Sequence, residues 1–341
     1  MIAYYHPDSA RHKPLHRIAG GELRPTFETV ARIELLQQGL QELNIPLAMP
    51  DVDAARLGHL ISAQHDAGYL AFLEQGFATW QAMPGTGPEL RTSVHTSRHM
   101  TRLPEDFLGR AGYYQADSSS VLVEGTWEAA RASAMAALAA AEAALAGRGP
   151  AYALCRPPGH HAYSDQAGGF CYLNNAALAA NAAAAQGARV AVLDVDVHHG
   201  NGTQQIFYSR PDVLTVSLHG DPAWLYPYHA GYADEAGTGA GAGANLNLPL
   251  PLHSGFAAYA EAMQLALARI RAHGTEVLVI ALGLDAYAGD PFACMGLRIE
   301  DFARLGAACR LPLPTIVVQE GGYPSPDLGR LLAAFLGGLA G

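Results

Sequence analysis

Acidic and imidazole side chains alternate with valine in the segment DVDVH, which begins at Asp194. In an extended chain every second side chain points to the same face, so Asp194, Asp196 and His198 are expected to project together. Carboxylates buried side by side without a cationic partner are costly, and a bound metal ion removes that cost. Asp285, at the end of the apolar run VLVIALGLD, is the expected third ligand beside Asp196 and His198.

Two carboxylates and one imidazole leave a coordination position for water, which favours a catalytic zinc site, since structural zinc sites usually contain cysteines. The same three ligands could bind iron in place of zinc. Each residue taken alone has an ordinary alternative, because an Asp after a strand often caps a turn and a single His is often only hydrogen-bonded structure. The conjunction of DVDVHHGNG, GLD and the tandem His160-His161 predicts the metal site.

The tandem histidines His160 and His161 are the candidates for a general base. A zinc ion with two carboxylate ligands has its charge nearly cancelled and lowers the pKa of water less than a three-histidine site does, so a separate base is needed. Two adjacent imidazoles are not easily protonated together. Asp194 and Asn201 are candidate partners, because a carboxylate favours an imidazolium while an amide fixes a tautomer without adding charge. The alternative is that the two histidines only form a structural turn.

Tyr323 follows two glycines in the segment EGGY. Glycines permit close backbone approach, which would let the phenol reach over the metal and donate to the oxyanion that forms when water attacks an amide carbonyl. The alternative is a glycine turn followed by an ordinary half-buried tyrosine. With the metal site and the base, the sequence predicts hydrolysis of an amide.

Four apolar runs position these residues, and each is followed directly by polar residues. The runs are AYAL before Cys155, VAVLDVDV, VLVIALGL and TIVVQ. Helical segments lie between them. Thr126 is expected to cap one that ends before Gly147, and Asn174 or Asn175 opens another that ends before Gly187. The alternation predicts an α/β fold with a central, mostly parallel sheet flanked by helices on both faces, and ligands bind at the carboxyl ends of such strands.

The 341 residues show no internal repeat and no break in composition, so one domain over 1–341 is expected. Residues 81–117 have little periodicity and are expected to form a long surface loop, which is either a lid or contact surface or a tolerated insertion. A net charge of -10 argues against electrostatic binding to nucleic acid or an anionic membrane. No apolar run is long enough to span a bilayer, the four cysteines show no Cys-x-x-Cys spacing, and a cytoplasmic location is expected.

The segments RPPGHHA, GGFCYLNN, DVDVHHGNGTQ, VSLHGDP, LGLDAY and EGGY together resemble the arginase-deacetylase superfamily, and within it the histone-deacetylase-like acetylpolyamine amidohydrolases of bacteria. The resemblance is strongest from Tyr152 to Tyr323. It implies the arginase-deacetylase fold and one zinc ion on the three ligands named above. It also implies that His161 acts as the base, that His160 is its electrostatic or acid partner, and that Tyr323 polarises the carbonyl.

The same resemblance implies structural monovalent cations, potassium or sodium. The first would be bound by the side chains of Asp194 and Ser217 and by the carbonyls of Asp196, His198 and Leu218, and Phe207 matches a backbone ligand of the second. The residues implied for the walls of a narrow substrate tunnel are Gly169, Phe170 and Tyr226. Asn201 stands where many lysine deacetylases carry Asp.

The implied substrate is a small acylated amine such as an acetylpolyamine, which would be cleaved to acetate and the free amine. Members of that branch often carry an acidic residue soon after Gly-Tyr-Tyr to receive the distal ammonium, whereas this chain reads QADSSSVLV and offers only Asp117 out of register. The branch also forms homodimers through the long excursion, here 81–117. The competing hypotheses are a deacetylase of acetyl-lysine in proteins and a non-catalytic protein that binds or senses acyl-amines.

Overall fold

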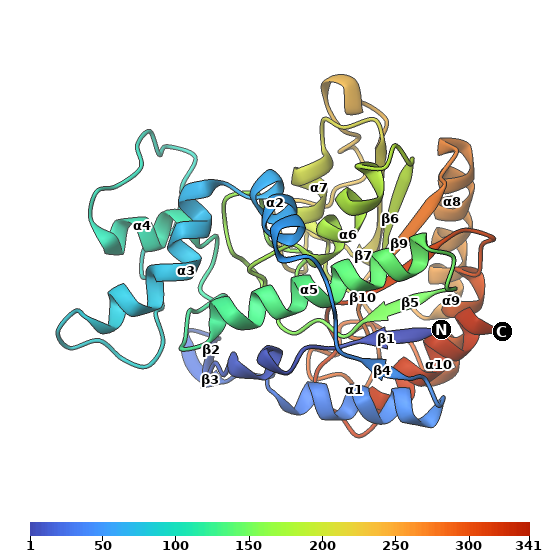
Figure 1. Ribbon diagram of the computed structural model, residues 1–341, viewed down its shortest axis with the longest axis horizontal. Helices are drawn as coiled ribbons and strands as arrows, with labels where there is room; N and C mark the ends of the chain where they lie inside the picture. The colour runs from blue at the N-terminus through green and yellow to red at the C-terminus, as the bar shows by residue number, and fades with distance from the viewer.

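The computed structural model describes residues 1–341 and contains an eight-stranded sheet in which every neighbouring pair of strands is parallel (Figure 1). The strand order is β4-β1-β5-β10-β9-β6-β7-β8. The strands are β1 (Ile2–Tyr4), β4 (Leu47–Ala48), β5 (Ala151–Ala153), β6 (Val190–Asp194), β7 (Val213–Gly220), β8 (Asn245–Leu250), β9 (Val277–Leu282) and β10 (Thr315–Gln319). A separate antiparallel hairpin pairs β2 (His16–Ala19) with β3 (Glu22–Pro25).

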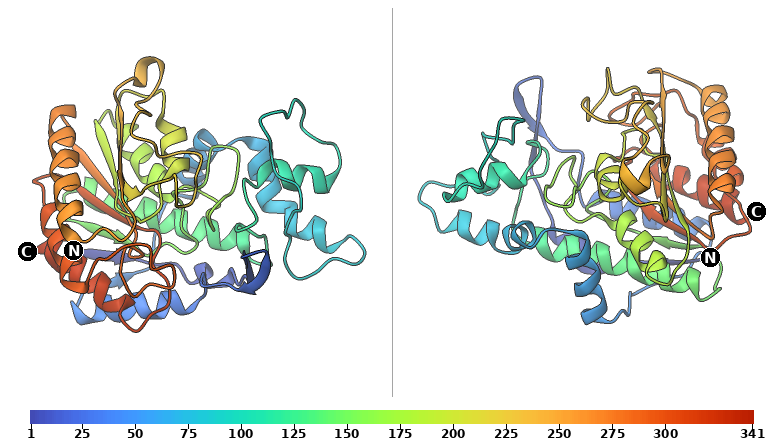
Figure 2. Two further views of the ribbon diagram at one scale, coloured as in Figure 1. Left: turned by 180° about the vertical axis from the view of Figure 1, so that it is seen from behind. Right: turned by 90° about the horizontal axis from the view of Figure 1, so that it is seen from above.

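Helices cover both faces of the sheet, which confirms the predicted α/β class. One apolar core lies between the sheet and α2 (Ala54–Gln64), α3 (Ala67–Gln81), α5 (Thr126–Leu145) and α6 (Asn175–Ala184). The other lies against α1 (Ala31–Glu42), α8 (Phe256–His273), α9 (Ile299–Ala308) and α10 (Leu328–Ala340). Figure 2 shows the C-terminal helices, in orange and red, gathered beside the two termini. The structure has no helix that is both long and apolar enough to cross a membrane.

The four strands predicted from the sequence are the four central neighbours of the sheet, β5, β10, β9 and β6. They are buried along their whole length, and this produces the continuous apolar runs by which they are recognised. The flanking strands escaped prediction because polar residues alternate along β7 and β8 and because β1 and β4 are short.

The predicted helix ends are correct in all but one place. The side chain of Asn174 accepts a hydrogen bond from the backbone N–H of Ala177 and caps α6. Gly147 and Gly187 have positive φ angles just past the ends of α5 and α6, as helix-terminating glycines do. The expected cap at Thr126 is wrong. Gly125 is the N-cap of α5, and the Thr126 hydroxyl bonds instead to the backbone of the preceding loop.

The chain after β6 differs from the extended strand that was expected through His198. β6 ends at Asp194, and a turn follows. Asp194 Oδ1 accepts from the N–H of Asp196 at 3.0 Å, and Asp196 Oδ1 accepts from the N–H of His198 at 2.9 Å. Val195 and Val197 nevertheless pack in the core, so the expected separation of polar and apolar side chains holds without regular strand geometry.

Residues 81–117 project from one end of the molecule beyond α3 (Figure 1). The segment is not only a loop, because α4 (Phe107–Tyr114) forms within it. Asp106 caps this short helix through the N–H groups of Leu108 and Gly109, and its two turns are too few to produce a convincing periodic pattern. Large apolar side chains are exposed along the segment, namely Val94, Met100, Leu103 and Leu108.

Candidate metal centre and active site

Asp196, His198 and Asp285 are buried and converge after the carboxyl ends of β6 and β9. One potential ligand atom from each lies within 4.8 Å of the others. His198 Nδ1 is 3.2 Å from Asp196 Oδ1 and 3.2 Å from Asp285 Oδ2. The arrangement brings together the three residues predicted as metal ligands.

The triad fits a divalent cation on the evidence of its own unsatisfied groups. Asp285 Oδ2 is buried, and its 3.2 Å approach to His198 Nδ1 does not form a well-aligned hydrogen bond. Burial raises the pKa of Asp285, and the nearby carboxylate of Asp196 raises it further. Gly321 lies against both carboxylates, so closely that an added Cβ would collide with them. Two carboxylate oxygens and one imidazole nitrogen in a small buried space are a donor set that suits zinc.

The imidazoles of His160 and His161 lie beside the triad, with ring centroids 4.0 Å apart. Their partners differ. His160 Nδ1 is 2.9 Å from Asp194 Oδ2, whereas His161 Nδ1 is 2.6 Å from the amide oxygen of Asn201. Both hydrogen bonds are donated by the imidazole, because the carboxylate and the amide oxygen can only accept. His161 is therefore held as the tautomer whose Nε2 is free to accept a proton.

The environments of the two imidazoles separate their proton affinities. Burial opposes protonation of His160, but the carboxylates of Asp194 and Asp196 outweigh it and raise the pKa of His160 to about 10. Burial lowers the pKa of His161 well below its usual value, and the charge on His160 lowers it further. The pair therefore combines an imidazolium with a neutral imidazole, which is the division that acid and base roles require.

Glu320, which was not predicted from the sequence, positions the backbone that carries His160. Its Oε2 accepts from the N–H of Gly159 at 2.6 Å and from the N–H of His160 at 2.9 Å. Burial raises the pKa of Glu320 to about 7. The backbone carbonyl of the same residue, His160, accepts hydrogen bonds from the N–H groups of Gly202 and Thr203. The signal for Glu320 was its place directly before Gly321, at the end of a predicted strand.

Tyr323, in the loop after β10, lines the same cavity as His161, in the loop after β5, and His198, in the loop after β6. Its backbone N–H donates to Asp290 Oδ2 at 2.9 Å. Its ring packs against Phe292, with centroids 4.9 Å apart, and against Phe170 at 6.0 Å. The predicted base, a metal ligand and the predicted phenol therefore share one cavity.

This cavity has a volume of about 240 Å³ and mostly aromatic walls. Gly169, Phe170 and Tyr226, the three residues implied for a substrate tunnel, all line it. Gly169 has a φ of +53°, and an added Cβ would collide with the His161 ring, so glycine is required there. The Tyr226 ring packs edge-on against His161, with centroids 4.9 Å apart.

Asp117 lies behind the walls of the cavity rather than on its surface. Its Oδ2 accepts from the N–H of Gly169 at 3.0 Å and from the hydroxyl of Tyr226 at 2.5 Å. Its Oδ1 accepts from the N–H of Ser119 at 2.7 Å. The carboxylate thus joins two walls of the cavity, and its suggested role in binding an ammonium group stays a prediction.

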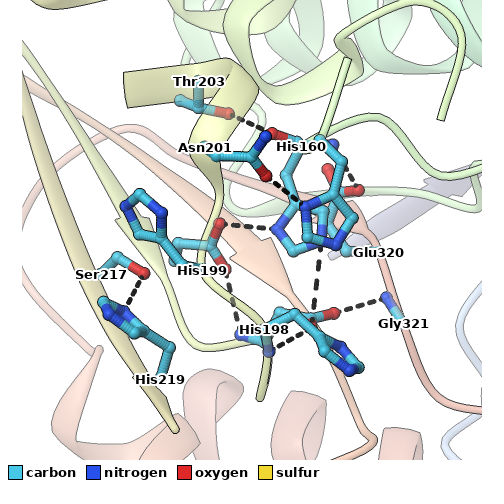
Figure 3. A network of polar contacts seen from close by, with 12 residues as sticks. His160, His198, His199, Asn201, Thr203, Ser217, His219, Glu320 and Gly321 are labelled. Carbon is cyan, nitrogen blue, oxygen red and sulfur yellow. Dashed lines mark hydrogen bonds and ion pairs between the residues drawn. The ribbon is translucent and has the colours of Figure 1, made fainter. Parts of the chain in front are cut away.

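The residues expected around the first monovalent cation lie on β6, on β7 and in the turn between β6 and α7 (Asn201–Phe207). Asp194 and Ser217 are directly opposite each other in the sheet. The Ser217 hydroxyl is 2.8 Å from Nδ1 of His219 (Figure 3), and Leu218 is buried beside them. Phe207, expected at the second cation, is buried at the end of α7. Occupancy by potassium or sodium stays a prediction.

Arg17, Tyr228 and Phe292 also line the cavity, and no sequence pattern predicted them. Arg17 belongs to the β2–β3 hairpin, and the other two lie in irregular segments. The one local signal was Gly20-Gly21, a pair suited to a tight hairpin turn, but nothing in it relates the hairpin to residues far along the chain.

A parallel sheet that ends in a buried cation-binding triad, with an imidazole pair and an aromatic cavity beside it, defines a metal-dependent hydrolase. Comparison with known proteins agrees, because residues 26–339 match the histone deacetylase domain. The chain therefore belongs to the histone deacetylase domain family.

Two relatives and one solved structure illustrate the similarity. The chain is 45% identical to an acetylpolyamine amidohydrolase of Burkholderia pseudomallei (strain 1710b), over 99% of this chain and 98% of the relative. It is 44% identical to an acetylpolyamine amidohydrolase of Mycoplana ramosa, over 94% of each chain. A crystal structure of acetylpolyamine aminohydrolase from Burkholderia pseudomallei superposes with a TM-score of 0.95 at 44% identity, covering 100% of this chain and 98% of that one.

Proposed function

We propose that this protein is a zinc-dependent amidohydrolase that cleaves N-acetyl amides of small aliphatic amines into acetate and the free amine. The observation that carries the proposal is the cation-binding triad beside His161, whose Nδ1 is held by Asn201 and whose Nε2 is free. Acetylpolyamines are the substrate class that the names of the relatives suggest. The cavity, lined by Phe170, Tyr226, Phe292 and Tyr323, suits an aliphatic chain.

Asp196, His198 and Asp285 would hold the zinc ion. When bound, zinc supplies Lewis-acid polarisation of the amide carbonyl and makes a neighbouring water more acidic. His161 Nε2 takes the proton from the attacking water, and the amide of Asn201 keeps the imidazole in the required tautomer. His160, paired with Asp194, supplies a fixed positive charge beside the negative charge that develops during attack.

Tyr323 donates its phenolic hydrogen bond to the carbonyl oxygen as that oxygen becomes negative. Burial raises the pKa of Tyr323 well above its usual value, so the phenol keeps its proton. The proton held at His161 then passes to the departing nitrogen, which leaves as an amine. Phe170 and Tyr226 hold the aliphatic chain and exclude bulk water from the reacting bond.

Two further properties belong to the same proposal. The side chains of Asp194 and Ser217 would hold a potassium or sodium ion, which would stabilise the loop that carries Asp196 and His198. Residues 81–117 form a homodimer interface, which is supported by the exposed Val94, Met100 and Leu103 on a projecting segment. Analytical ultracentrifugation of the full chain and of a Met100→Glu, Leu103→Glu variant tests the dimer, which should dissociate in the variant.

The activity is tested by incubating the purified protein with acetylputrescine, acetylspermidine and an acetyl-lysine peptide and measuring the acetate released. We expect hydrolysis of the small amides, loss of activity after chelation, and recovery when zinc is restored. Preferential cleavage of the peptide would favour the protein deacetylase hypothesis. Tight binding of the acetyl amides without acetate release would favour the non-catalytic one.

A further inference from the structure

One cationic side chain, that of Arg17, lines the cavity that leads to the metal centre. Arg17 is the only residue of the lining with a permanent charge, and no Asp or Glu lines the cavity. Arg17 lies on β2, within the hairpin that turns at Gly20-Gly21. Its neighbour Ile18 also lines the cavity, so the hairpin forms part of the wall.

The guanidinium of Arg17 is held by aromatic rings and not by a carboxylate. Its Cζ lies 4.3 Å from the centroid of the Phe27 ring and 5.9 Å from that of Phe292. Its Nε is buried without a hydrogen-bond partner. The nearby Arg91, in contrast, pairs with Glu89. These aromatic contacts hold the guanidinium and leave its terminal nitrogens without a carboxylate partner.

Phe292 links this guanidinium to the reaction centre. Its ring lies 4.9 Å from the ring of Tyr323 and 5.7 Å from that of His198, measured between centroids. A substrate whose acetyl group lies between Tyr323 and His161 would extend along Phe292, so its other end would reach Arg17. The carboxylate of Asp117 forms no ion pair with Arg17 and does not line the cavity; it accepts its hydrogen bonds from Ser119, Gly169 and Tyr226.

We propose that Arg17 is a specificity-determining residue that binds a carboxylate at the distal end of the substrate. A carboxylate matches the two-pronged guanidinium, whereas an ammonium group there would meet a like charge. The inference rests on the proposed amidohydrolase function and narrows its substrate class. Acetamides of amino acids are preferred over acetamides of diamines with the same chain length.

Three acetamides that differ only at the distal end of a five-methylene chain provide the test: 6-acetamidohexanoate, N-acetylcadaverine and the neutral N-pentylacetamide. The kcat/KM value of the wild-type zinc enzyme should be highest for the carboxylate, lower for the neutral amide and lowest for N-acetylcadaverine. Arg17→Gln should reduce the value for the carboxylate about five- to tenfold and leave that for the neutral amide within about twofold. Arg17→Glu should make acetylcadaverine the best of the three.

Arg24→Gln is the matched control, because Arg24 lies opposite Arg17 on the hairpin but pairs with Glu22 and does not line the cavity. The ratios between the kcat/KM values of the three acetamides should be the same in Arg24→Gln as in the wild type. Calorimetric titration of the zinc-depleted protein with the same amides gives a second measure, since the preference for the carboxylate should appear in Kd without turnover.

The outcomes separate the two proposals. Hydrolysis of all three amides with the same ratio in the wild type and in both Arg17 variants would overturn the role of Arg17 while the proposed function stands. Binding that favours the carboxylate and depends on Arg17, without acetate release by the zinc-loaded enzyme, would support the subsite and overturn the hydrolase.

Discussion

The guanidinium of Arg32 lies 4.9 Å from the centroid of the Tyr323 ring, inside a buried network that joins α1 to the loop after β10. Its Nε donates to the carbonyl of Gly322 at 2.6 Å, and a second nitrogen donates to the carbonyl of Glu320. Glu28 balances the charge and pairs with Arg32 at 2.9 Å and with Arg156 at 2.7 Å. Residues near the start of the chain thus position a phenol near its end.

Replacing Arg32 by Met should lower both activity and stability. The loop that carries Tyr323 loses two hydrogen-bond donors, and the buried Glu28 keeps only Arg156. We expect kcat to fall at least about tenfold through misplacement of Tyr323, and the free energy of unfolding to fall by about 3 kcal/mol. Zinc content should be unchanged, because Arg32 is not a ligand. A variant with normal kcat and reduced stability would show that Arg32 supports only the fold.

Asn201→Asp should move the pH dependence of activity. A carboxylate beside His161 Nδ1 stabilises the imidazolium and raises the pKa of the base. Since only neutral His161 can accept a proton, the acid limb of the kcat/KM profile should shift upward by about one pH unit. The profile of the Thr203→Ser variant serves as a control for disturbance of the same helix. An unchanged acid limb in Asn201→Asp would exclude His161 as the group that titrates.

Asp117→Ala tests whether this carboxylate joins the cavity walls or binds an ammonium group. Loss of the hydrogen bonds to Gly169 and Tyr226 should loosen both walls and lower kcat/KM about tenfold for every substrate. The kcat/KM values for N-pentylacetamide and N-acetylcadaverine should therefore fall by the same factor. A loss confined to acetylcadaverine would instead support direct recognition of the ammonium group.

Glu89 links the β2–β3 hairpin to the body of the molecule and should make stability depend on pH. Burial tends to raise its pKa, but hydrogen bonds from the backbone of Leu15 and from His16 outweigh burial and lower the pKa. An acid with a lowered pKa stabilises the fold above its unfolded-state value, and that contribution is lost as the pH falls through the folded-state value.

Glu89→Gln should accordingly cost about 1 kcal/mol at neutral pH. Urea denaturation of both proteins between pH 7 and about pH 3.5 should show the difference shrinking below about pH 4.5, where the wild type also loses the charge. A difference that stays constant over this range would mean that the charge of Glu89 contributes nothing.

The sequence predicted the parts of the fold and site that depend on local chemistry. The central strands were evident because complete burial leaves only apolar residues. Asp196, His198 and Asp285 were predicted to meet because strand ends converge at one edge of a sheet, and their potential ligand atoms do lie together. The partners of the two imidazoles stayed open until the structure placed Asp194 beside His160 and Asn201 beside His161.

Contacts between distant segments were not predictable in this way. Arg17 and Phe292 meet at the cavity although they are far apart in the chain, and no local pattern relates a hairpin residue to a later irregular segment. Asp117 was identified only as an available acid. Its role in the wall depends on the positions of Gly169 and Tyr226, which only the folded chain brings to it.

The central claim is that Asp196, His198 and Asp285 hold one catalytic zinc ion, and metal analysis of the purified protein tests it most directly. The wild type should carry about one zinc per chain. Asp285→Ala should carry almost none while its circular dichroism spectrum stays the same. Equal zinc content in the two proteins, or a folded and active wild type without any divalent metal, would contradict the claim.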